Sequence, residues 1–429
     1  MATYLSRTPS SSGNRKKYTW SGWVKRSAID GTQQDLMAVS GASNDFNIFY
    51  FSSGGGEELV VYFADNGATG AYLQSTKKFR DTNAWYHIVA RVDTTHGTAD
   101  NRIRLYVNGE QLTSFVSRTN PAQNYEGLVN SSGNRLDIGS QGAGFSNGTG
   151  NFKGIMSHVH FLDGEDRDPS YFGETDSTTG EWKIKTNVTG VNYGTNGFFI
   201  LKDGNSVTDQ SGNSNNFTVG GGTLTKTEDN PSNVFCTLNP LSTSPITGTS
   251  GYFSNGNTVY DAPSGSPYDI SCGSTLGVKG GKWYWEVKWN IDGGGSQALG
   301  LGIYEADQPI DLFGNMRSAS GYKNVIWDTR HDLYVNGSDT GTNYTGASGD
   351  TFGFALDLDA GTLKIHQNGT YYNSGKAVTS AIDVSKTYLI LASPNGGSSH
   401  STATFNFGNG YFGTTAVSSA GTNASNIGI

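Results

Sequence analysis

The chain has 429 residues, of which 60 are Gly, 15% are charged and 12% are aromatic, and its formal net charge is −8. This length exceeds one ordinary β-sandwich and predicts two or three domains, each large enough to bury its own core. The aromatic content argues against a disordered chain, so the abundance of Gly, Ser, Thr and Asn indicates turns between many short strands.

Charge and hydropathy exclude further classes of function. No dense basic stripe is present, which disfavours nucleic-acid binding. No segment has the roughly 20 apolar residues that would span a bilayer, and the N-terminus lacks the apolar core of a signal peptide, so we expect a soluble protein without membrane insertion. Cys236 and Cys272 lie in loop-like sequence, which favours free thiols over a disulfide.

The first predicted strands lie between residues 18 and 162. Tyr18 to Arg26 is predicted to be a strand in which Gly22 marks a bulge that re-phases Trp20 and Trp23. Further strand candidates are separated by Gly, Asn and Asp turn signals, and they lie at 47–51, 59–63, 85–93, 102–107, 135–139 and 154–162. Their spacing predicts an antiparallel sandwich.

Phrases in this region also resemble a known family. In order over residues 15 to 165 they read YTWSGWVKR, AWYHIVARVDTT, NRIRLYVNGEQ, LDIGS and FKGIMSHVHFLDG. This order resembles the laminin-G-like jelly roll of the concanavalin A type. The resemblance implies a first domain over residues 1–165 and says little about the ligand.

Residues 166–250 are predicted to form a connector with short strands between Gly/Asn turns. Its phrases are DPSYFGETDSTTGEWKIK, YGTNGFFILKD, DQSGNSNNFT and FCTLNPL. They resemble a connector that accompanies such jelly rolls in predicted structural proteins of marine bacteriophages, including cyanophages. The resemblance implies a virion protein, a context that periodicity alone does not supply.

A second sandwich is predicted over residues 251–413. Trp283, Trp285, Val287 and Trp289 alternate with polar residues and are predicted to share one face of a strand. The phrases GKWYWEVKW, LGLGIY, GDTFGFALDLDAGTLKIHQNGT, TYLILAS and FNFGNG resemble a SPRY domain, a fold that generally serves as a binding module. The tail, residues 414–429, is expected to be flexible by composition.

The predicted fold is therefore all-β. It consists of two concanavalin A-like or SPRY-type antiparallel β-sandwiches joined by a Gly/Asn-rich connector. Tight turns are predicted at Asn108-Gly109 and Asn368-Gly369, because Asn and Gly adopt the positive φ angles that two-residue hairpin turns need.

A catalytic role would require a pair of carboxylates, because the glucanases among concanavalin A-like folds use such a pair. Asp357 and Asp359 share a strand face, but the Glu-x-Asp-x-x-Glu pattern of those enzymes is absent. We therefore expect both to be solvent-facing carboxylates before a turn. No Ser/His/Asp motif, phosphate-binding loop or Cys cluster appears either.

Two groups of residues could bind a metal. The carboxylates of Asp163, Glu165, Asp166 and Asp168 could ligate calcium, which takes several oxygen ligands, although their spacing is not that of a complete calcium loop and also suits an acidic surface turn. His158 and His160 share a strand face, but no third ligand is placed by the sequence. A packed or hydrogen-bonded pair is the better interpretation of the two histidines, and no other cofactor is predicted.

Aromatic residues in turn-rich segments could stack against a sugar ring. The candidates are Tyr322, Tyr334, Tyr344, Tyr371 and Tyr372. Trp327 is instead predicted to be a core residue. Core packing for Tyr334 and subunit contacts for the other tyrosines remain the alternatives to a sugar platform.

The functional prediction is a non-enzymatic structural protein on the surface of a bacteriophage virion, assembled in the cytoplasm of the bacterial host. It would act as a tail- or fibre-associated adhesin that contacts a host surface glycan or a protein. Its other expected partners are virion proteins and further copies of itself, as a homo-oligomer.

Three alternatives stay open at this point. A capsid decoration protein, either a cement or a head-fibre protein, needs the same rigid modules. A polysaccharide hydrolase would need a carboxylate pair with one raised pKa inside a groove. A secreted host lectin would need an export signal, which residues 1–12 do not supply.

Overall fold

The computed structural model is all-β and divides into two compact units. The first contains residues 1–226 and 230–234, and the second contains residues 227–229 and 235–429. The structure describes residues 3–41, 44–141, 150–202, 206–243, 252–262, 271–292, 298–308, 323–329, 332–343, 345–379, 382–395 and 400–418.

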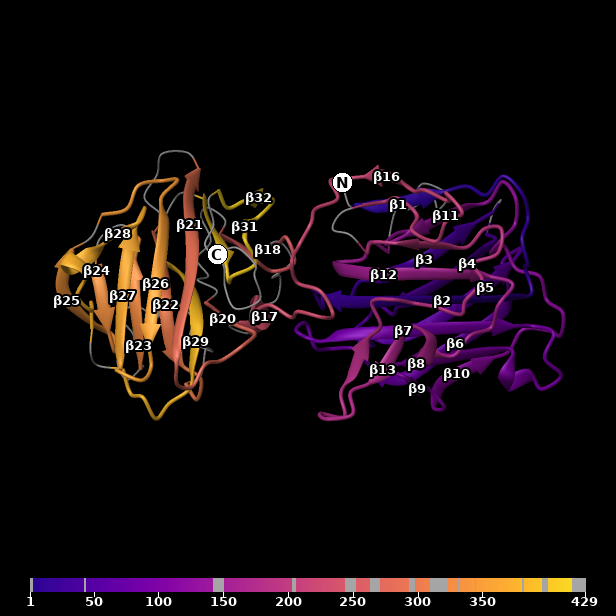
Figure 1. Cartoon of the computed structure of the whole chain (residues 1–429), viewed down its shortest axis with the longest axis horizontal. Coiled ribbons are helices and arrows are strands. Elements are labelled where there is room, and N and C mark those ends of the chain that lie inside the picture. The colour runs from indigo at the N-terminus through magenta and orange to yellow at the C-terminus, as the bar shows by residue number, and fades with distance from the viewer. Residues whose placement is uncertain are drawn as a thin grey trace. The chain divides into compact units, whose positions relative to one another are not determined.

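The first unit is a sandwich of two antiparallel sheets, drawn in indigo to magenta in Figure 1. One sheet has eight strands, in the order β10 (Phe115–Thr119), β6 (Ala68–Lys78), β5 (Glu58–Asp65), β4 (Phe46–Phe51), β3 (Gln34–Ser40), β11 (Arg135–Ile138), β1 (Tyr4–Arg7) and β16 (Thr218–Gly221). The other has six, in the order β15 (Phe198–Ile200), β12 (Gly154–Asp163), β2 (Lys17–Arg26), β7 (Trp85–Asp93), β8 (Ile103–Val107) and β9 (Glu110–Gln111).

Alternating apolar side chains fill the space between these two sheets. Trp20, Phe49, Val61 and Leu105 come from four different strands and are at most 2% exposed. A separate two-stranded ribbon is formed by β13 (Gly173–Thr175) and β14 (Trp182–Ile184). The described helical turns η1 (Ala99–Asn101), η3 (Pro169–Tyr171) and η4 (Tyr372–Gly375) are 3-10 turns, and no helix among the described residues has the length and apolar character needed to cross a membrane.

The predicted bulge lies on a different strand from the one expected. The pairing of β2 with β7 is regular through Gly22, whereas on the other side β12 carries the irregularity between Ser157 and His160. Trp20 therefore faces the core and Trp23 the outer side of the sheet. Gly22 is needed for another reason, since a Cβ there would approach the Trp20 ring to 2.8 Å.

The segment predicted to be a connector is largely part of the first sandwich. Strand β15 pairs with β12 at the edge of the six-stranded sheet, and β16 pairs with β1 at the edge of the eight-stranded sheet. Phe198, Ile200 and Phe217 are buried in the core of this unit. The first unit therefore continues to residue 226, and the predicted boundary at residue 165 is wrong because burying these aromatic and aliphatic side chains completes the sandwich.

The second unit is also a sandwich of two antiparallel sheets, drawn in orange to yellow in Figure 1. One sheet has the order β17 (Leu238–Thr243), β20 (Cys272–Ser274), β29 (Tyr388–Asn395), β22 (Ala298–Glu305), β23 (Asn324–Asp328), β24 (Asp332–Val335) and β25 (Ser338–Asn343). The other has the order β18 (Phe253–Ser254), β19 (Val259–Ala262), β30 (His400–Asn406), β21 (Lys282–Asp292), β26 (Thr351–Asp357), β27 (Thr362–Gln367) and β28 (Thr370–Tyr371).

This unit starts earlier and ends later than predicted. Leu238 of β17 is fully buried, so the sandwich includes residues that were assigned to the connector. At the other end, β32 (Thr415–Ala416) pairs with β31 (Tyr411–Phe412), which extends ordered structure into the predicted tail. Residues 419–429 lie outside the described residues. Cys236 and Cys272 are free thiols, as predicted.

Local sequence signals specify the hairpins correctly. Asn108 and Gly109 have φ angles of 49° and 83°, and Asn368 and Gly369 have φ angles of 48° and 83°. These are the left-handed conformations that tight hairpin turns require and that Asn and Gly tolerate best. Both predicted turns are therefore confirmed.

Candidate functional site

Residues that follow β12 fold back over the outer face of the six-stranded sheet. Phe172 packs there against Val89 and Leu162, which point away from the sandwich core. We call residues 166–193 the covering segment. Because this segment shields apolar side chains on the outer face, the sheet is buried on both sides. This is expected of a sheet whose strands carry apolar side chains on both faces.

A three-ring stack fixes the β13–β14 ribbon to the sheet. The His87 ring lies between the rings of Trp23, 4.8 Å away, and Trp182, 6.0 Å away, with interplanar angles of 16°. Trp182 Nε1 donates to His87 Nδ1 over 3.0 Å, so His87 Nε2 carries the proton and donates to Ser21 Oγ over 2.9 Å. Complete burial lowers the pKa of His87 to about 3.

The predicted calcium ligands hold the covering segment to the sheet through their protein partners. Asp166 pairs with Arg91 and Arg104, and Asp168 pairs with Arg91. Among the described residues, no group of three or more His, Cys, Asp or Glu side chains has a metal-binding arrangement. In this structure Asp166 and Asp168 thus form ion pairs with arginines of the sheet.

The other two carboxylates of the predicted calcium set are also occupied. Asp163 accepts hydrogen bonds from the backbone N–H groups of Asn14 and Asn196, at 2.7 and 3.0 Å. Glu165 binds Arg167 through both oxygens, at 2.8 and 2.9 Å, and this guanidinium lowers the pKa of the carboxyl. Both carboxylates act as caps or ion pairs within the first unit.

His158 and His160 are packed side chains, as the sequence favoured. The ring of His160 stacks on Phe199 with centroids 3.9 Å apart, and its Nδ1 lies 2.8 Å from the Tyr193 hydroxyl. Burial lowers the pKa of His160 well below its ordinary value. His158, at the bulge of β12, is hydrogen-bonded to Ser157.

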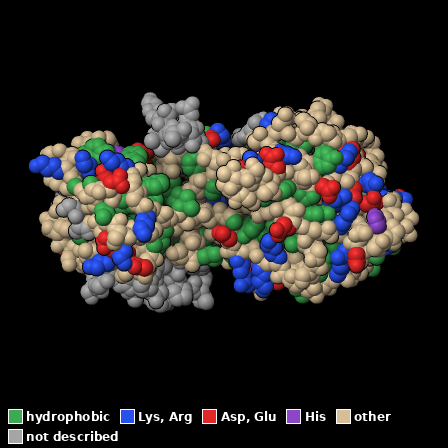
Figure 2. Space-filling model, turned by 60° about the horizontal axis from the view of Figure 1, so that its bottom comes forward, with side chains coloured by type: hydrophobic (Ala, Val, Ile, Leu, Met, Phe, Trp, Pro, Cys, Tyr) green, Lys and Arg blue, Asp and Glu red, His purple; other side chains and the backbone are tan. Residues whose placement is uncertain are grey.

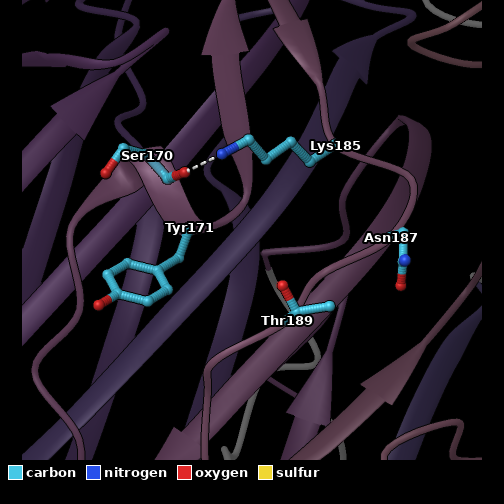
Figure 3. Close-up of a pocket in the computed structure, with 5 residues that line it drawn as sticks. All are labelled: Ser170, Tyr171, Lys185, Asn187 and Thr189. Atoms are coloured by element: carbon cyan, nitrogen blue, oxygen red, sulfur yellow. Dashed lines mark hydrogen bonds between the residues drawn. The ribbon is translucent and has the colours of Figure 1, made fainter.

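The covering segment also encloses a hollow of about 430 Å³ (Figure 3). Five residues line it, from η3, from the end of the ribbon and from the loop beyond: Ser170, Tyr171, Lys185, Asn187 and Thr189. Lys185 Nζ donates to the Ser170 carbonyl over 2.7 Å, a bond drawn in Figure 3. The Tyr171 hydroxyl accepts from Arg167 over 3.0 Å, and the guanidinium lies 4.9 Å from the ring centroid.

The lining can bind a polar ligand rich in hydroxyl groups. Lys185 and Tyr171 are held in place by the bonds just described, whereas the side chains of Ser170, Asn187 and Thr189 have no hydrogen-bond partner among the described residues. Hydroxyl and amide groups both donate and accept, so the three together with the ammonium can satisfy several hydroxyls of one ligand. This chemistry suits a saccharide.

The tyrosines predicted to form a sugar platform do not lie on one surface. Tyr322 and Tyr344 lie outside the described residues. Tyr334 pairs with Ile326, which points to the outer side of the β17–β25 sheet, whereas Tyr371 lies on the other sheet beside His366. Tyr372 packs against Trp327 and the core of the second unit. Trp327 is buried, as predicted.

Asp357 and Asp359 cap turns, which is in line with their prediction as carboxylates before a turn. Asp357 Oδ1 accepts from the backbone N–H groups of Asp359 and Ala360, at 3.1 and 3.0 Å. Asp359 Oδ1 accepts from Gly281 N over 2.9 Å. The hydrogen bond from the Ala360 backbone N–H lowers the pKa of Asp357.

Two other carboxyls have raised pKa values. Asp35 on β3 pairs with Tyr50, and Asp137 on β11 pairs with Ala38, so both side chains point outward from the eight-stranded sheet on neighbouring strands. Burial raises the pKa of both, and for Asp137 the nearby Arg135 opposes this effect. Asp35 Oδ2 and Asp137 Oδ1 are buried without a hydrogen-bond partner.

Comparison with known proteins supports the predicted fold of the first unit. The family model described as the concanavalin A-like lectin/glucanases superfamily, Laminin_G_3, matches residues 2–169. The chain is thus all-β, as predicted, with a concanavalin A-like fold over the matched residues. No curated protein matches the chain.

Three solved structures illustrate the range of similar folds. The SPRY domain of human HERC1 is 18% identical, with 39% of this chain and 96% of that chain covered and a TM-score of 0.30. A SAP-like pentraxin from Limulus polyphemus is 15% identical, with 39% and 71% covered and a TM-score of 0.29. A putative carbohydrate binding protein from Bacteroides ovatus is 22% identical, with 52% and 57% covered and a TM-score of 0.35.

Charges of both signs are mixed on one face of the molecule. On the face drawn in Figure 2, Lys and Arg side chains are interspersed with Asp and Glu, and no broad patch of one sign is visible. Nucleic-acid binding normally needs a basic patch or stripe. This face does not carry one.

Proposed function

We propose that this protein is a non-enzymatic, saccharide-binding structural protein on the surface of a bacteriophage virion. The observation that carries the binding part is the hollow in the covering segment, with three polar side chains unengaged and two others held in position. The concanavalin A-like fold fits a binding or adhesin role. The virion part rests on sequence resemblance to marine bacteriophage structural proteins.

These two lines of support meet in one stretch of sequence. The phrase DPSYFGETDSTTGEWKIK, which carries part of the bacteriophage resemblance, contains three of the five residues that line the hollow: Ser170, Tyr171 and Lys185. A binding hollow suits a tail- or fibre-associated adhesin that meets a host glycan. Capsid decoration, as a cement or head-fibre protein, is the alternative placement, with other virion proteins and further copies of the chain as partners.

The binding proposal is tested by screening the full chain on an array of bacterial surface saccharides. Lys185→Ala and Tyr171→Ala should each weaken binding at least about tenfold, the size of about 1.4 kcal/mol. Lys183→Ala is the matched control, because Lys183 lies on the same ribbon but pairs with Asp176 outside the hollow. Equal binding by all four proteins would contradict the proposal.

The virion placement needs a separate measurement. Antibodies against the purified chain should label intact bacteriophage particles in electron micrographs, at the tail for an adhesin and over the head for a decoration protein. Labelling of the host cell surface in the absence of particles would contradict a virion role.

A polysaccharide hydrolase is kept as a second candidate because of Asp35 and Asp137. Two buried carboxyls with raised pKa values on neighbouring strands are the kind of groups from which an acid pair is built. Steady release of reducing ends from a polysaccharide, lost in both Asp35→Asn and Asp137→Asn, would establish this activity. Binding without turnover would favour the adhesin.

A further inference from the structure

We propose that Trp283 and Asp359 form a second saccharide subsite, on the second sandwich. This inference rests on the proposed saccharide-binding function and adds a binding position separate from the hollow. Trp283 was predicted to share one strand face with Trp285 and Trp289, since the three alternate along one strand. The other two are buried, whereas Trp283 is 48% exposed, because it stands at the beginning of β21, beyond the end of the core that covers them.

The indole is held in a fixed orientation although it is exposed. Trp283 Nε1 donates to the Gly280 carbonyl over 2.8 Å, which ties the polar edge of the ring to the preceding turn. Gly280 and Gly281 have φ angles of 88° and 79°, a left-handed conformation that only Gly adopts freely. The turn and the ring therefore form one preorganised unit, which reduces the entropy lost when a ligand stacks on the ring.

A carboxylate is fixed to the same pair of glycines. Asp359 Oδ1 accepts from Gly281 N over 2.9 Å, next to the residue whose carbonyl holds the indole. Its other oxygen, Oδ2, has no partner among the described residues, and the side chain is exposed. An aromatic face and an acceptor carboxylate thus flank one backbone turn.

This pair of groups matches the chemistry of a sugar ring. The C–H groups of a pyranose pack on an indole face, and a charged carboxylate accepts strong hydrogen bonds from neighbouring hydroxyls. Exposed Tyr371, at 40%, differs from Trp283, since its ring stands edge-on to His366. Trp283 is the one exposed indole among the eight tryptophans of the chain.

The test is protection of Trp283 from oxidation by N-bromosuccinimide, mapped by mass spectrometry on the full chain. The probes are glucose, galactose, mannose, N-acetylglucosamine and their oligomers. A bound saccharide should slow oxidation of Trp283 in proportion to the occupied fraction. Trp283→Ala should weaken oligomer binding about three- to tenfold, and Asp359→Asn, which keeps the acceptor for Gly281, about threefold.

Tyr371→Ala is the matched control, since it removes an exposed aromatic ring from the same sandwich, and thermal unfolding checks that each variant is folded. Saccharide binding that is lost in Lys185→Ala but leaves Trp283 unprotected would overturn this inference and leave the hollow standing. Protection of Trp283 that survives Lys185→Ala and Tyr171→Ala would support it and show that this subsite binds independently of the hollow. Absence of any saccharide binding by the unaltered chain would overturn both.

Discussion

The two sandwiches treat one of their outer faces in opposite ways. In the first, the outer face of the six-stranded sheet is covered by residues 166–193, and His87 is completely buried between two indole rings. In the second, the outer face of the sheet that contains β21 carries a polar row in which Glu286, Gly353 and His366 lie side by side on three strands. Figure 1 shows these strands running side by side, with β28 next to β27.

The difference shows two ways to stabilise the outer face of a sandwich sheet: hydrogen bonds among its own polar side chains, or an additional covering layer. On the polar face, the Tyr284 hydroxyl donates to Glu286 Oε1 and lies 2.7 Å from His366 Nε2, while Gly369 N donates to His366 Nδ1 over 3.2 Å. These hydrogen bonds satisfy the polar groups without a covering element. On the covered face, apolar and aromatic side chains need the additional layer.

The largest expected effect comes from removing the indole that closes the covered face. Trp182→Ala removes the ring that the ribbon contributes to the stack and leaves His87 Nδ1 without its hydrogen-bond donor. The free energy of unfolding of the first unit should therefore fall by about 3 kcal/mol. Calorimetric unfolding of the full chain measures this. Thr178→Ala, in the exposed turn of the same ribbon, is the control, and an equal loss in both variants would contradict the role of the stack.

The next largest effect is expected on acidification, which should lower the free energy of unfolding of the first unit. The folded pKa of His87 is about 3, below the ordinary value of about 6.5, so between these pH values the unfolded chain binds a proton that the folded imidazole does not. The free energy of unfolding therefore falls as the pH falls through this window, by about 1.4 kcal/mol for each pH unit. Calorimetry from pH 6.5 to 4.5 should show this slope in the first unit.

His87→Gln removes the titrating group and should flatten that slope. Burial also lowers the pKa of His160 in the same unit, so some acid sensitivity will remain. In the second unit, burial lowers the pKa of His366 while Glu286 opposes the shift. An unchanged slope in His87→Gln would show that the stack does not control the acid response.

A pair of glycine variants sharpens the same comparison. Gly173→Ala would place a methyl group 2.6 Å from the Trp182 ring, which is confined under the ribbon, and should cost about 2 kcal/mol. Gly353→Ala would overlap the His366 ring, which is 7% exposed and hydrogen-bonded through both nitrogens, so a similar cost of about 2 kcal/mol is expected. Denaturant unfolding measures both, and a much smaller cost for Gly353→Ala would show that the His366 ring moves aside.

The smallest effect is expected for charges on the uncovered face. Lys282 is an exposed residue paired with Asp357 at 3.3 Å, and its side chain is mostly in solvent. Exposed ion pairs contribute little because water and salt screen them. Lys282→Ala should leave the unfolding midpoint almost unchanged in a thermal melt. A shift comparable to that of Gly173→Ala would show that the ion pair on this face contributes to stability.

Much of the fold was predictable where side chains alternate and turns carry Asn-Gly. Strands β7, β8, β21 and β26 were found for this reason. The edge strands β15 and β16 were missed because three consecutive apolar residues, Phe198 to Ile200, and the sequence Thr218 to Gly221 have no alternation. Their pairing depends on strands far away in the sequence.

The hollow was less predictable than the strands. Its residues, from Ser170 to Thr189, come together only when the covering segment lies on the sheet, and nothing in their spacing indicates this. One usable signal was present: Phe172 and Trp182 are large aromatic side chains in a stretch assigned to a connector, and such residues are usually buried. The exposure of Trp283 was not predictable, because alternation predicts which face a side chain occupies but not where the core ends.

The pairing of β1 with β16 has a consequence for how the protein forms. Ser6 and Thr218 are neighbours across this edge although 212 residues separate them. The ribosome must therefore synthesise nearly all of the first unit before the eight-stranded sheet can be completed, and pairing between such distant strands makes folding slow. Until then β1 exposes an unpaired strand edge, the kind of surface through which nascent chains aggregate.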